Sequence, residues 1–110
     1  MSNQILFSFD CEEWGLFGSV LNEVINGFRV PDFERTIGTD RDSLKKLLTH
    51  LQTPGDADEL VLGMKETRAI RNALQETIRK LGAWEFHTRT GYELERGKEV
   101  LAKLDKLLTG

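Results

Sequence analysis

The residues most able to carry chemistry are two glutamates, Glu23 and Glu76, which stand 53 positions apart in matching surroundings. Two carboxylates that meet can hold a metal ion or share a proton. A helical wheel, however, places each about 140° from the centre of the apolar stripe on its predicted helix, and so outside the main core. The sequence therefore favours a surface role, in which each glutamate hydrogen-bonds the connecting segment that follows it. The expected partners on those segments are Arg35, Thr36, Thr88 and Arg89.

The histidines and the single cysteine give no clearer sign of catalysis. Histidine side chains titrate near neutral pH, and His87 lies in EFHTR, where we interpret it as a loop residue with satisfied hydrogen bonds rather than as a general base. Cys11 opens a predicted helix, a position that favours a thiolate, but three acidic neighbours oppose it. The chain contains no metal-ligand spacing, phosphate-binding glycine loop or nucleophile motif. We therefore expect no catalytic residue, cofactor or metal, and an unrecognised enzyme is the third interpretation of function.

The helices and strands expected to position these residues lie in a segment whose sequence occurs twice in the chain. A shift of 53 positions lays 21–51 over 74–104 without a gap, and eight of the pairs are identical. At average residue usage, chance supplies roughly two identities over such a span. The sequence therefore predicts an internal duplication, with repeat unit one at 5–53 and repeat unit two at 58–110.

Each unit is predicted to contain a short strand and two helices. In the first unit, Asp10 and Glu13 have capping-box spacing, and the apolar residues that follow recur every three or four positions, as in an amphipathic helix. A connector follows, which ends at Gly38 or Gly91, where a positive φ is often needed. The strands are expected at about 7–9 and 60–62, and the second helices at about 40–51 and 93–108.

Two units of about fifty residues are each near the lower limit for independent folding, so they should share one core. We therefore predict a single domain over 1–110, mainly α with at most a short two-stranded ribbon, in the order β-α-α-β-α-α and with pseudo-twofold symmetry. The 39% hydrophobic and 30% charged residues are typical of a soluble globular protein. Short apolar runs, the lack of a secretory signal and a single cysteine favour a cytoplasmic location and no membrane partner.

DNA binding is the alternative function. The net charge of −3 lacks the bulk signature of a nucleic-acid binder. Segment 33–51 nevertheless resembles the latter part of a helix-turn-helix, although Asp40 and Asp42 at the start of its second helix would repel phosphate. Two predicted helices carry a basic edge. The residues of these edges are Arg41, Lys45 and Lys46 in one unit, and Lys65, Arg68, Arg71 and Arg79 in the other.

The interpretation that we favour is a protein-interaction or regulatory module. The chain has more apolar and aromatic positions than one core of this size requires, and Trp84 stands where the other unit has Pro31. Apolar side chains that stay exposed form a patch for a protein partner or for a second copy, as in a homodimer. The candidate interaction residues are Trp14, Trp84, Glu23, Glu76, His87 and Arg89.

Two segments of the chain are distinctive. LNEVING begins at Leu21, and EFHTRTG begins at Glu85. These segments resemble the ALNEVxNG and EFxTRxG motifs of a family of short bacterial proteins to which no activity is assigned. The match is partial, because Val20 replaces the alanine of the first motif and the second unit has LQETIRK in place of its helix motif. The resemblance implies a bacterial relative and implies no chemistry.

Overall fold

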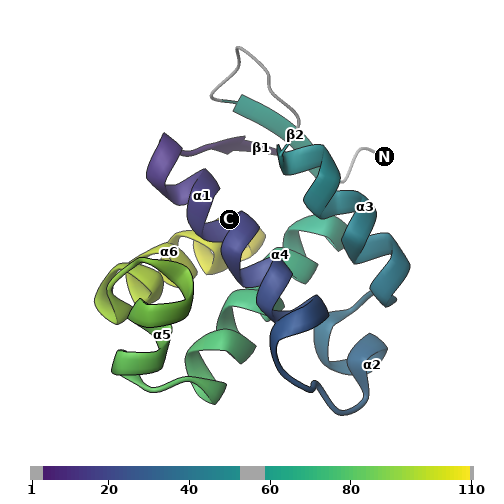
Figure 1. The fold of residues 1–110 in the computed structure, drawn as a ribbon. Coiled ribbons are helices and arrows are strands. Elements are labelled where there is room, and N and C mark those ends of the chain that lie inside the picture. Colours follow the sequence, from purple (N-terminus) through teal and green to yellow (C-terminus); the bar gives the residue numbers. More distant parts are fainter. Residues whose placement is uncertain (1–3, 53–58, 110) are drawn as a thin grey trace.

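The computed structural model describes residues 4–52 and 59–109, and the predicted linker at 53–58 lies outside the described residues. The chain is mainly helical, as predicted (Figure 1). The elements are β1 (Gln4–Ser8), α1 (Cys11–Asn22), the π-helix η1 (Glu23–Gly27), α2 (Phe33–Ile37), α3 (Arg41–Gln52), β2 (Glu59–Gly63), α4 (Met64–Lys80), α5 (Ala83–Thr90) and α6 (Leu94–Thr109).

The two strands pair as an antiparallel ribbon at one end of the helical body (Figure 1). The register places Gln4 opposite Gly63 and Phe7 opposite Leu60. A ribbon of two strands is marginal by itself, so the helices beside it must supply most of its stability.

The predicted order β-α-α-β-α-α is wrong in one respect, because both connectors are helical. They form α2 and α5, whose last turns close when Gly38 N–H donates to the Glu34 carbonyl at 2.8 Å and Gly91 N–H donates to the His87 carbonyl at 2.9 Å. Proline and glycine at the connector ends suggested loops. Each connector instead has two apolar or small side chains four positions apart. Residues with this spacing lie on the same face of a helix, and here that face turns toward the core. Gly38 and Gly91 have φ of +100° and +81°, so the predicted positive φ is confirmed.

The capping box at the start of α1 is also confirmed. Glu13 N–H donates to the Asp10 carboxylate at 2.8 Å, and Asp10 N–H donates to the Glu13 carboxylate at 3.0 Å. Together these bonds satisfy two backbone donors where α1 leaves β1. The predicted second helices correspond to α3 and α6, with ends one residue from those expected.

The buried apolar side chains form one cluster drawn from both halves of the chain. Helix α1 packs against α3 and α4, and α4 packs against α6 and α2. Leu16 and Val20 of α1 are fully buried in this core. Of the helices in the described ranges, none is long and apolar enough to span a membrane.

One close contact shapes the second half of the core. Phe86 of α5 is fully buried, and its ring tip lies 2.7 Å from the place where a Cβ on Gly97 would stand. Gly97 occupies the repeat position of Leu44, which is itself fully buried. The glycine of α6 therefore makes room for the phenylalanine of α5.

Candidate interaction site

Helix α5 has one buried face and one exposed face. Phe86 and Thr90, which lie one turn apart, are buried, and the Thr90 hydroxyl donates to the Phe86 carbonyl at 2.7 Å. Trp84 lies about 200° around the helix from Phe86 and therefore points away from the core. Trp84 is 78% exposed, and it is the one exposed large hydrophobic residue among the residues whose side chains are described. His87 and Thr88 are exposed as well.

The other tryptophan has a different environment. The Trp14 ring packs edge-to-face against Phe17, with ring centroids 5.7 Å apart, and against Phe9 at 6.0 Å. Phe9 and Phe17 pack against each other in the same manner at 4.9 Å. Trp14 thus belongs to an aromatic cluster at the margin of the core. Of the two candidate tryptophans, Trp84 is the one that the fold leaves accessible.

An ion-pair network around Arg89 holds α5 in place. The Arg89 guanidinium donates to the Glu23 carboxylate at 3.0 Å and to the Glu85 carboxylate at 3.1 Å. It also reaches the Gly27 carbonyl at 3.4 Å. The hydrogen bonds to Glu23 and Glu85 raise the pKa of Arg89, because both hold its charged form. The network joins the end of the α1–η1 helix to α5.

Gly27 leaves the space that this network uses. A Cβ on Gly27 would overlap the Glu23 carboxylate. Glu23 therefore folds back over the π-helical turn of η1 and faces Arg89. Such single-turn π-helices are often found at functional sites. The prediction that Glu23 bonds the connector that follows it is wrong, because its partner is Arg89, on the connector of the other unit.

The remaining candidate residues of this kind have local partners. Glu76 pairs with Arg79 at 2.9 Å on the same helix. His87 Nε2 lies 3.5 Å from a Glu93 carboxylate oxygen. Within residues 4–52 and 59–109, no group of three or more His, Cys, Asp or Glu is placed to hold a metal ion.

Three of the candidate nucleic-acid residues are engaged within the protein. Arg41 donates to the Ile25 carbonyl, and its guanidinium carbon lies 4.6 Å from the centre of the Phe33 ring. Arg71 forms an ion pair with Asp105 at 2.6 Å. Arg79 is held by Glu76, as described above.

The other candidate cations gather near a groove between α3 and the start of α4. The groove has a volume of about 540 Å³. Lys46, His50 and Lys65 line it, together with the carboxylate-bearing Glu66 and the apolar Leu47, Leu62 and Ala69. Lys65 also lines a neighbouring cleft with Arg68, whereas Lys45 is exposed on α3 outside the groove lining. The two basic edges predicted separately thus come together at Lys46 and Lys65.

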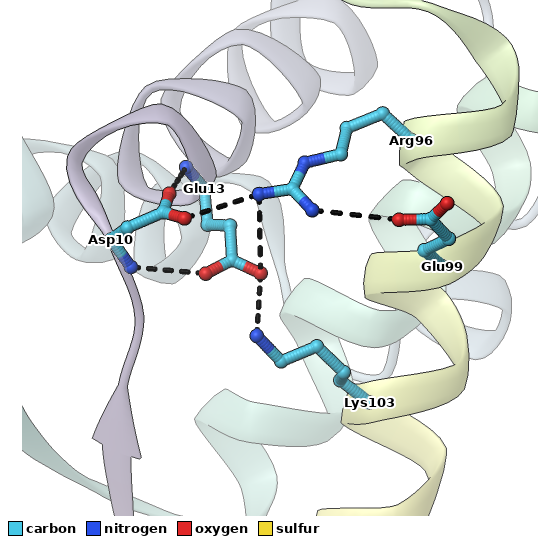
Figure 2. A network of polar contacts seen from close by, with 5 residues as sticks. All are labelled: Asp10, Glu13, Arg96, Glu99 and Lys103. Atoms are coloured by element: carbon cyan, nitrogen blue, oxygen red, sulfur yellow. Dashed lines mark hydrogen bonds and ion pairs between the residues drawn. The ribbon is translucent and has the colours of Figure 1, made fainter.

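A second polar network joins α1 to α6 (Figure 2). Glu13 is only 3% exposed, and the Lys103 ammonium donates to its carboxylate at 2.6 Å. Arg96 pairs with Asp10 at 3.1 Å and lies 3.9 Å from Glu13. Lys103 also stands 4.7 Å from the centre of the Phe9 ring. Each charge in this network has a partner of opposite sign, so the buried Glu13 carboxylate is not left unpaired.

Sequence patterns identified Asp10 and Glu13 only as a helix cap. Their second role depends on Lys103, which lies 90 residues from Glu13, and no local spacing reveals such a contact.

Comparisons of the chain with protein-family models, with curated proteins and with solved structures give no match.

Proposed function

We propose that this chain is a protein-interaction module that binds its partner through the exposed face of α5, with Trp84 as the anchor. The observation that carries the proposal is the 78% exposure of Trp84, since every other large apolar side chain that the structure describes is at least partly buried. Tryptophan is among the residues most enriched at the energetic centres of protein interfaces.

The energy available from this side chain is large enough to matter. Burying a tryptophan removes roughly 150–250 Å² from water. At roughly 25 cal/mol per Å², this gives about 4 to 6 kcal/mol before the costs of association are subtracted. Those costs are of similar size, so the indole needs a polar rim and a rigid scaffold to give useful affinity. Glu85 and His87, one and three positions after Trp84 on the same helix, are exposed polar residues.

The scaffold of Trp84 is held from two sides. Phe86 anchors α5 in the core, and Arg89 ties it to Glu23 and Gly27. A side chain presented by a fixed helix loses less conformational freedom on binding than one on a mobile loop. This arrangement supports the assignment of α5 as the presenting element.

We also propose that the fold arose by internal duplication, with a pseudo-twofold axis through the ribbon. The helix starts support it, since Cys11 and Met64 are 53 positions apart and so are Arg41 and Leu94. The strand register is compatible with it as well, because Phe7 is opposite Leu60, its counterpart 53 positions later. In that case Trp84 is a feature of one copy only, and the interaction is specific to the second unit.

Affinity capture from native cell extract tests the function. Wild-type protein and the W84A variant serve as bait, with Lys106→Ala as a matched change at an exposed residue of α6. A captured protein is then purified and titrated against each variant. We expect saturable binding that weakens by more than about tenfold in W84A and is unchanged in Lys106→Ala. Equal affinity of wild type and W84A for every captured protein contradicts the proposal.

The nucleic-acid alternative has weaker support. Arg41, Arg71 and Arg79 are engaged within the protein, and α2 has five residues, which is short for the first helix of a helix-turn-helix. A gel shift on random duplex DNA tests it. Because non-specific phosphate binding is strongest at low salt, the lack of a shift at low salt excludes the alternative.

A further inference from the structure

We draw no further inference here: the strongest candidate, the groove between α3 and the start of α4 that Lys46, His50 and Lys65 line, carries nothing, because nothing in the structure shows what fills it and its lysines stand near the carboxylates of Glu66 and Asp40.

Discussion

Glu23 and Arg89 lie 66 residues apart in the sequence and form a hydrogen-bonded ion pair of 3.0 Å between η1 and α5. The carboxylate belongs to the segment LNEVING and the guanidinium to EFHTRTG. The two distinctive segments of the chain are therefore the two sides of one contact. That contact fixes the helix that carries Trp84.

Gly27→Ala should break this contact without weakening the fold. The new Cβ overlaps the Glu23 carboxylate, which must swing away from Arg89. Replacing a helical glycine by alanine gains roughly 0.5–1 kcal/mol, so the free energy of unfolding should stay constant or rise. Hydrogen exchange of the α5 amides should nevertheless become faster, because α5 loses a tether.

Glu23→Gln is the matched variant for this prediction, since it keeps the size of the side chain and removes its charge. It should also accelerate exchange in α5. Unchanged exchange of α5 in both variants, measured by mass spectrometry, would show that the ion pair does not hold the helix.

Gly97→Ala should destabilise the protein although it improves helix propensity. Alanine gains about 1 kcal/mol over glycine within a helix. The added Cβ, however, stands 2.7 Å from the buried ring tip of Phe86, and overpacking of this kind costs about 1–3 kcal/mol. We expect a net loss of about 1 kcal/mol in urea denaturation. The loss should shrink in a Phe86→Leu background, and an equal loss in both backgrounds would exclude the clash as its cause.

Local rules predicted the parts of the fold that depend on neighbouring residues. The cap at Asp10, the positive φ of Gly38 and Gly91, and the ends of α3 and α6 follow from capping, glycine geometry and apolar spacing. The same rules did not predict that the connectors are helical, because the burial of Ile37 in α2 and of Phe86 in α5 depends on packing against other helices. Asp32 adopts a left-handed φ of +50° after Pro31, which allows α2 to begin directly afterwards.

The candidate site was predictable in composition and not in arrangement. Trp14 and Trp84 are equally apolar, and only the packing of Phe9 and Phe17 around Trp14 distinguishes them. The basic edges likewise have similar sequences. Arg71 nevertheless forms an ion pair with Asp105, 34 residues away, whereas Lys65 lines the groove. Contacts over such separations depend on how the helices pack, which a single sequence does not encode in any local pattern.

Lys103→Met should weaken the fold through Glu13. The carboxylate of Glu13 is 3% exposed and would keep only its backbone hydrogen bond and a more distant Arg96. A buried polar group that loses a partner costs about 1–3 kcal/mol. Lys103→Arg keeps the charge and should restore most of the stability, whereas Lys106→Met on the same helix should have little effect. Chemical denaturation checks all three, and a Lys103→Met variant as stable as wild type contradicts the role of the pair.

Acid should destabilise the protein partly through its helix caps. The Glu13 N–H lowers the pKa of Asp10 from its usual 3.8, and hydrogen bonds from Ser43 lower the pKa of Asp40. A folded pKa below the unfolded value means that ionisation stabilises the fold above pH 3.8. This stabilisation is lost as the pH falls through the folded pKa.

Asp10→Asn combined with Asp40→Asn isolates this charge effect, because asparagine caps helices nearly as well as aspartate. The variant should be less stable than wild type at neutral pH. Its stability should also decline less in acid, so that the two curves converge. Parallel curves of unfolding free energy from neutral to acidic pH would show that other groups control acid sensitivity.

The two tryptophans should differ in their contribution to stability and in how strongly their fluorescence is quenched. Trp84→Ala removes a side chain that is 78% exposed, and such surface changes alter stability by no more than about 0.5 kcal/mol. Trp14→Ala opens a gap beside Phe9 and Phe17, and the loss should be about 2–3 kcal/mol, below the 3–5 kcal/mol of a fully buried ring. In single-tryptophan variants made with phenylalanine, Trp84 emission should be quenched strongly by acrylamide and Trp14 emission weakly. Equal quenching of both would mean that Trp84 is covered in solution. If the quenching of Trp84 then falls as the protein concentration rises, the side chain is covered by another copy of the chain.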